Sequence, residues 1–139
     1  MPDDVQDGLH IDKKKNILVV DDEPGIVSLI DDYLTIRGYN VYAALDGEEG
    51  LDAAKKVVPD IIILDIMMPH MNGYEMLRRL KKDKRTMSIP VIMLSAKTGD
   101  NDKLKAMELY SETYMTKPFE LADLKEKIET VLNTAETGS

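Results

Sequence analysis

The chain has 139 residues, of which 43% are hydrophobic and 32% charged, which is the size and balance of one folded domain. It carries 26 acidic against 18 basic side chains, and a net charge of −8 disfavours autonomous binding to the phosphate backbone of nucleic acid. The lack of cysteine excludes disulfides, thiolate metal sites and a cysteine nucleophile. No apolar run approaches the roughly 20 residues that span a bilayer, and the polar start does not resemble a secretory signal, so we expect a cytoplasmic protein outside the membrane.

We expect one domain with loose ends. Residues 1–14 are polar with only scattered apolar positions, and residues 135–139 are polar as well. Segments without periodic apolar residues have little to bury. The expected organisation is therefore a loose N-terminal arm at 1–14, a domain at 15–134 and a frayed C-terminus at 135–139.

The predicted elements of this domain alternate between strand and helix. A continuous apolar strand at 17–20 is followed by apolar residues at helical spacing over 26–34, and Gly38 follows this helix as a stop signal. The remaining segments follow in the same order: strand 40–44, helix 48–57, strand 61–64, helix 73–83, strand 91–94, helix 100–109, strand 113–116 and helix 119–132.

Three of the strands, at 17–20, 61–64 and 91–94, are apolar at every position. Such strands must be covered on both faces, as they are in a parallel sheet between layers of helices. The repeated strand-then-helix order implies right-handed crossovers. Together these features predict an α/β fold with a doubly wound parallel sheet of five strands.

Polar side chains follow four of these strands at the point where each strand ends. Asp21 and Asp22 come after the first strand, Asp65 after the third, Ser95 after the fourth and Lys117 after the fifth. Ligands of open α/β sheets bind outside the carboxyl ends of the strands. We therefore expect three carboxylates, a hydroxyl and an amine to converge on one edge of the sheet.

Crowded carboxylates repel one another unless one of them is protonated or a cation binds. Carboxylate oxygens without histidine or cysteine favour Mg²⁺, which indicates a magnesium site. The alternative is that Asp21 or Asp22 caps the helix that begins near Pro24. Capping accounts for one aspartate, but not for two of them together with Asp65.

The carboxylate of Asp65 is a candidate nucleophile. Beside a metal site it could attack a phosphoryl group and form an acyl phosphate, whose charge Lys117 could balance. Taken singly, Asp65 also fits a turn residue, Ser95 a common strand-end residue and Lys117 a solvated lysine before Pro118. The functional interpretation depends on their combination.

That combination resembles the receiver domain of two-component response regulators, in its chemotaxis-type single-domain form. The resemblance rests on Asp21-Asp22, on Asp65 in the segment Leu-Asp-Ile-Met-Met-Pro, on Ser95-Ala96 and on Lys117-Pro118-Phe119, and it covers roughly residues 15–132. It implies a flavodoxin-like fold whose parallel strands lie in the order 2-1-3-4-5, with helices on both faces.

The resemblance also implies roles for the residues at the strand ends. Asp65 would be the phosphoacceptor. Asp22 would bind Mg²⁺ directly and Asp21 largely through water, and Asp65 and the backbone carbonyl of Met67 would complete the protein ligands. Ser95 and Lys117 would contact the phosphoryl oxygens, and the bond from Lys117 to Pro118 is commonly cis in this family.

A switch is implied as well. Tyr114 matches the family's switch aromatic, which moves when the hydroxyl of Ser95 turns to the phosphoryl group. This motion would change the surface formed by the fourth helix, the fifth strand and the fifth helix. The chain departs from the family at Tyr110, where a glycine is usual, so the surface near Tyr110 is the part for which the family is the poorest guide.

The implied function is signalling rather than metabolic catalysis. A sensor histidine kinase or a phosphotransfer protein would supply the phosphoryl group, and the domain would catalyse only its own phosphorylation and dephosphorylation. Because no DNA-binding segment follows Leu132, we expect output through a protein partner and no direct contact with nucleic acid. The sequence leaves open a stand-alone receiver and a receiver fragment of a longer regulator whose output domain is missing.

Two other classes fit less well. A phosphatase of the haloacid dehalogenase type also uses an aspartate nucleophile, Mg²⁺ and a lysine, but it needs a second aspartate at the position of Met67. A nucleotide-binding module needs a glycine-rich phosphate loop after the first strand, where this chain has Asp22-Glu23-Pro24-Gly25.

Overall fold

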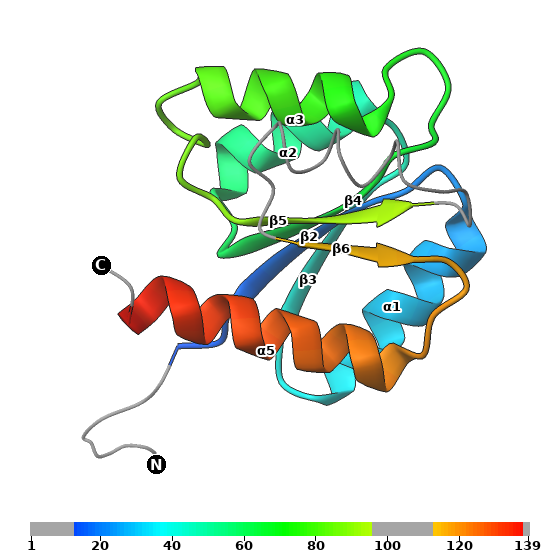
Figure 1. The fold of residues 1–139 in the computed structure, drawn as a ribbon, viewed down its shortest axis with the longest axis vertical. Helices are drawn as coiled ribbons and strands as arrows, with labels where there is room; N and C mark the ends of the chain where they lie inside the picture. Colours follow the sequence, from blue (N-terminus) through cyan, green and yellow to red (C-terminus); the bar gives the residue numbers. More distant parts are fainter. Residues whose placement is uncertain (1–12, 96–112, 138–139) are drawn as a thin grey trace.

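The computed structural model describes residues 13–95 and 113–137, and Figure 1 draws the other segments as a thin grey trace. The helix predicted at 100–109 and Tyr110 lie outside the described residues. The elements are β2 (Asn16–Val20), α1 (Pro24–Ile36), β3 (Asn40–Ala44), α2 (Gly47–Val57), β4 (Ile61–Asp65), α3 (Gly73–Lys82), β5 (Val91–Ser95), β6 (Thr113–Thr116) and α5 (Leu121–Thr137).

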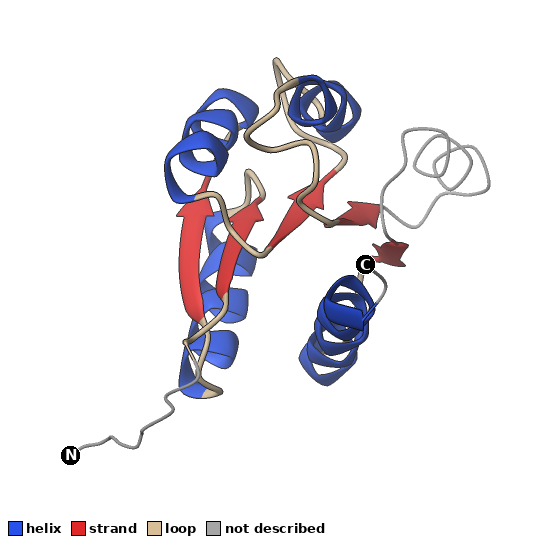
Figure 2. Cartoon of the chain, turned by 90° about the vertical axis from the view of Figure 1, so that its left-hand side faces the viewer, coloured by secondary structure: helices blue, strands red, loops and turns tan. Residues whose placement is uncertain are grey.

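The five strands form one parallel sheet in the order β3-β2-β4-β5-β6. Counted along the chain this is the order 2-1-3-4-5, so the predicted flavodoxin-like topology is confirmed. Helices lie on both sides of the sheet (Figure 2). None of the helices in the described segments is both long enough and apolar enough to cross a membrane.

Alternate residues of the central strands enter two separate cores. In β2, Leu18 and Val20 pack with α2 and α3, whereas Ile17 and Val19 pack with α1 and α5. The same division is visible in Figure 1, where α2 and α3 lie above the sheet and α1 and α5 below it. Successive side chains of a strand point to opposite faces, which is why these strands are apolar at every position.

The ends of several elements differ from the sequence-based expectation. Asp65 and Ser95 are the last residues of β4 and β5 rather than the first residues after them. Helix α5 continues to Thr137, so the backbone from 135 to 137 is helical. The physical reason is that residues 133–137 contain no glycine or proline, and Gly138 is the first residue that disfavours a helix.

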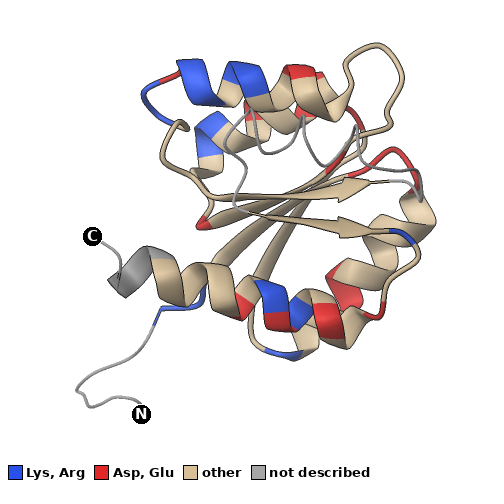
Figure 3. Ribbon diagram, viewed as in Figure 1, with Lys and Arg blue, Asp and Glu red and all other residues tan. Residues whose placement is uncertain are grey.

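Because all strands are parallel, their carboxyl ends lie at the same edge of the sheet. The register pairs Asp65 of β4 with Leu94 of β5, and Ser95 of β5 with Thr116 of β6. Figure 3 shows acidic positions in the turn between β2 and α1 and a basic position directly after β6. The topology thereby brings residues from distant parts of the chain to one edge.

Candidate functional site

Three carboxylates gather at this edge. Asp21 follows β2 and is fully buried, Asp65 ends β4 and is 3% exposed, and Asp22 is half-buried between the turn and solvent. One carboxylate oxygen from each lies within 4.8 Å of the other two. The two chain segments therefore place three acidic groups within reach of one small cation.

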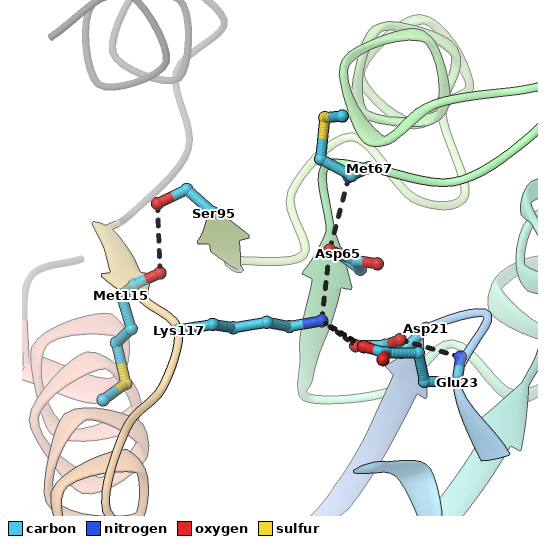
Figure 4. Close-up of polar contacts among 7 residues, drawn as sticks. All are labelled: Asp21, Glu23, Asp65, Met67, Ser95, Met115 and Lys117. Atoms are coloured by element: carbon cyan, nitrogen blue, oxygen red, sulfur yellow. Dashed lines mark hydrogen bonds and ion pairs between the residues drawn. The ribbon is translucent and has the colours of Figure 1, made fainter. Parts of the chain in front are cut away.

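Lys117 lies among these acids (Figure 4). Its Nζ atom is 2.9 Å from Oδ2 of Asp21, 3.1 Å from Oε1 of Glu23 and 3.5 Å from Oδ1 of Asp65. The peptide bond from Lys117 to Pro118 is cis, as the resemblance implied. Glu23 was not among the residues predicted for the site, although its place directly after the aspartate pair put it at the same edge.

Burial and neighbouring charges shift the pKa values of the two central groups, Asp65 and Lys117. Burial and then the charge of Asp21 raise the pKa of Asp65, Lys117 and the N–H of Met67 oppose the rise, and the net result is a pKa of about 7. Burial also works against the charged form of Lys117, but its contacts with Asp21, Asp65 and Glu23 outweigh this and hold the pKa of the ammonium above its ordinary value. The lysine is therefore a permanent cation beside a carboxyl group that titrates near neutrality.

Helix capping does not explain the aspartate pair. The N-cap of α1 is Glu23, and its side chain makes no capping hydrogen bond. Oδ1 of Asp21 instead accepts a hydrogen bond of 3.0 Å from the N–H of Glu23, which fixes the turn that follows β2. Asp21 is thus held by the turn while its second oxygen faces Lys117.

The backbone around Asp65 is tightly packed. The N–H of Met67 donates to Oδ1 of Asp65 at 3.3 Å, and the N–H of Gly73 donates to the carbonyl of Ile66 at 2.9 Å. A Cβ atom at Gly73 would lie 2.4 Å from the carbonyl oxygen of Asp65. Only glycine allows the first turn of α3 to pack this closely against the end of β4, a constraint that the helical pattern of the sequence did not reveal.

Ser95 and Tyr114 lie farther from the carboxylates. Ser95 is 4% exposed, and its hydroxyl donates to the carbonyl of Met115 at 3.4 Å, toward β6 (Figure 4). Tyr114 is half-buried on β6 and packs against the core under α2 and α3. The structure therefore brings Asp21, Asp22, Asp65 and Lys117 together, while Ser95 is hydrogen-bonded to the neighbouring strand.

The donor set suits a hard divalent cation. The acidic cluster offers only oxygen atoms, and such ligands favour Mg²⁺ over the softer metals. Among the described residues, the ammonium of Lys117 is the one cation paired with Asp21, Glu23 and Asp65, so a divalent cation would relieve an excess of negative charge. The residues present therefore fit a magnesium site.

Comparison with known proteins identifies the family. A sequence model described as the response regulator receiver domain matches residues 17–129. The chain belongs to this family of two-component signalling domains, which confirms the resemblance seen in the sequence and favours it over the phosphatase and nucleotide-binding alternatives. Receiver domains are not conventional metabolic enzymes, and they typically bind Mg²⁺ in an acidic pocket.

Individual relatives agree with this assignment. The chain is 41% identical over 125 residues to the alkaline phosphatase synthesis transcriptional regulatory protein PhoP of Bacillus subtilis, covering 90% of this chain and 51% of that protein. A CheY-like receiver domain protein of Methanospirillum hungatei is similar in structure, with a TM-score of 0.85, 28% identity and coverage of 91% of this chain and 100% of that one. The N-terminal domain of a receiver protein of Methanoculleus marisnigri is 43% identical, with a TM-score of 0.69 and coverage of 85% and 96%. The chain spans about half the length of the curated relatives that it matches.

The substitution Gly73→Ala tests the close packing at the end of β4. We expect it to lower the free energy of unfolding by about 2 kcal/mol, because the added methyl group must push against backbone atoms. Gly25→Ala is the matched control, since a Cβ atom there meets nothing within 4 Å and alanine favours the helix by about 0.5–1 kcal/mol. Urea unfolding of both variants measures the effect, and an equal response at the two positions would contradict the packing argument.

The raised pKa of Asp65 predicts how the free energy of unfolding depends on pH when a chelator keeps the protein free of metal. The folded state holds the Asp65 proton up to about pH 7, whereas the unfolded chain releases it near pH 4, so this group's contribution to stability falls as pH rises between these values. Asp65→Asn cannot ionise. We expect its advantage in unfolding free energy over the wild type to grow by on the order of 2 kcal/mol from pH 5 to pH 8. A pH-independent difference in urea unfolding would rule out the assigned titration.

Proposed function

We propose that Asp65 accepts a phosphoryl group from a sensor histidine kinase or a phosphotransfer protein. The observation that carries the proposal is a nearly buried carboxylate at a strand end, with two further carboxylates within 4.8 Å and an ammonium at 3.5 Å. In the reaction an oxygen of Asp65 forms a bond to phosphorus while the bond from phosphorus to the donor's histidine nitrogen breaks. Such transfer needs positioning and charge neutralisation more than an acid–base pair.

The metal ligands in this proposal are Asp21, Asp22, Asp65 and the backbone carbonyl of Met67. When bound, Mg²⁺ supplies the positive charge that lets an anionic phosphoryl group approach an acidic pocket. Two of these ligands are oriented by backbone hydrogen bonds. The N–H of Glu23 donates to the carboxylate of Asp21, and the N–H of Met67 donates to the carboxylate of Asp65. The oxygen-only donor set supports this role.

Lys117 and Ser95 would respond to the new charge on Asp65. A phosphorylated aspartate adds negative charge and acceptor oxygens, which favour the Lys117 ammonium and a hydroxyl donor. The Ser95 hydroxyl has a long bond of 3.4 Å to exchange for a charge-assisted one. Tyr114 would then shift, and the surface formed by the fourth predicted helix, β6 and α5 would change its fit to a protein partner.

The wider context of the domain is also a proposal. PhoP and other relatives are described as transcriptional regulators, and the chain matches only about half of the length of each. The chain therefore functions either as a stand-alone receiver or as the receiver part of such a regulator. We place it in the cytoplasm, in keeping with a sequence that lacks cysteine, and assign it no direct nucleic-acid contact of its own.

Incubation with a small acyl phosphate and Mg²⁺ should add one phosphoryl group to the protein. Asp65→Asn should abolish the addition, because the amide is not a nucleophile for this reaction. Asp52→Asn, an exposed position on α2, is the control and should be labelled like the wild type. Intact-mass spectrometry reads the result, and labelling that persists in Asp65→Asn would refute the assignment.

The metal and coupling roles can be separated by two substitutions. Asp22→Ala should weaken Mg²⁺ binding at least about tenfold, since it removes a proposed direct ligand. Lys117→Ala should still bind Mg²⁺, because it removes a competing cation, but phosphorylation should no longer change the surface of β6 and α5. Chemical-shift titrations measure both effects. An unchanged titration of Asp22→Ala, or equal responses of the wild type and Lys117→Ala to phosphorylation, would count against these roles.

A further inference from the structure

Glu23 contacts Lys117 without belonging to the acidic cluster. Its Oε1 atom is 3.1 Å from Nζ of Lys117, although 61% of its side chain is exposed. The cluster suited to a cation, searched among the described residues, contains Asp21, Asp22 and Asp65 but not Glu23. Figure 4 shows Glu23 and Asp21 on the same side of the ammonium, while Asp65 approaches it from β4.

The place of Glu23 in α1 indicates that its carboxylate serves another purpose than capping. N-cap positions favour serine, threonine, aspartate and asparagine, whose short side chains reach the free N–H groups of the first turn. Glu23 is the N-cap of α1, and its side chain makes no such bond. The backbone carbonyl of Glu23 accepts hydrogen bonds of 3.1 Å from the N–H groups of Ile26 and Val27 in the first turn of α1. The side chain of Glu23 does not cap the helix but accepts a hydrogen bond from Lys117.

The ammonium of Lys117 therefore has three carboxylates around it, of which two come from the turn after β2. An ammonium has three N–H donors. The contacts with Asp21 and Glu23, at 2.9 and 3.1 Å, are shorter than the 3.5 Å separation from Asp65. A cation bound by the acidic cluster would weaken the attraction of Asp21 and Asp65 for the Lys117 ammonium. Glu23 lies outside this cluster, so its attraction for the ammonium would remain.

We infer that Glu23 is a positioning residue that holds the Lys117 ammonium on the β2 side of the pocket and competes with a phosphoryl group for it. The inference rests on the proposed phosphoryl chemistry at Asp65 and concerns its regulation. Because the Glu23 carboxylate is exposed, the competition is modest and tunes the balance between the two positions of Lys117.

Two variants of Glu23 separate its contact from its charge. Glu23→Gln removes the charge and weakens the contact with Lys117. Its Mg²⁺ affinity should fall by about twofold to fivefold. At saturating Mg²⁺, its affinity for beryllofluoride, a phosphoryl analogue, should rise by about the same factor. Glu23→Asp keeps the charge but is shorter and suited to capping, so Mg²⁺ affinity should stay near the wild-type value, beryllofluoride affinity should rise and the melting temperature should increase.

The control is Glu126→Gln, which removes one exposed carboxylate from α5 and should leave both affinities unchanged. Calorimetric titrations give the affinities. The side-chain NMR signal of Lys117 in the metal-free protein gives a readout that needs no phosphoryl analogue, and it should shift in both Glu23 variants and not in Glu126→Gln.

The outcomes separate this inference from the proposed function. If the wild type binds beryllofluoride and Glu23→Asp binds it no more tightly, the positioning role is overturned while the phosphoacceptor assignment stands. An unmoved Lys117 signal in both Glu23 variants overturns the positioning role in the same way. If the wild type binds neither Mg²⁺ nor beryllofluoride, the proposed function fails and this inference fails with it.

Discussion

Carboxylates from two distant segments share one ammonium at the edge of the sheet, and the chemistry proposed for this protein depends on that arrangement. Lys117 lies 96 positions after Asp21 in the chain, yet their side chains are 2.9 Å apart. Without the ammonium, Asp21 and Asp65 would be two nearly buried carboxyl groups with a strong mutual repulsion. In the proposed function, the pocket with its lysine is still acidic enough to attract a divalent cation, and the same lysine pairs with a phosphoryl oxygen.

The apolar sheet provides the rigidity that this arrangement needs. Strands β2, β4 and β5 are buried almost throughout, so their carboxyl ends cannot shift without disturbing two cores at once. Gly73 then allows α3 to begin directly against the backbone of Asp65. A similar close approach joins α2 to the loop before α3, because a Cβ atom at Gly47 would lie 2.8 Å from the sulfur of Met71. These two glycines thus allow the loop that carries Met67 to pack closely against α2 at one side and allow α3 to begin against the end of β4.

The site also carries energetic costs that the rest of the fold offsets. A carboxyl group whose pKa is raised to about 7 by burial and a neighbouring charge destabilises the folded state progressively from about pH 4, and fully above neutrality, when no cation is present. A glutamate at the N-cap of α1 forgoes the capping bond that a shorter side chain would make there. Such local departures from the most stable choice are expected where residues serve binding or chemistry instead of folding.

The sequence by itself determined the order of elements and the residues at the strand ends, because apolar patterning reports directly which segments are buried and where they stop. It therefore placed Asp21, Asp22, Asp65, Ser95 and Lys117 at one edge. Only the tertiary structure decided that the Ser95 hydroxyl bonds to Met115, that Glu23 joins Lys117 and that Gly73 must lack a side chain. These contacts depend on side-chain directions and on spacings between strands that are far apart in the chain, and patterning along one segment contains no information about either.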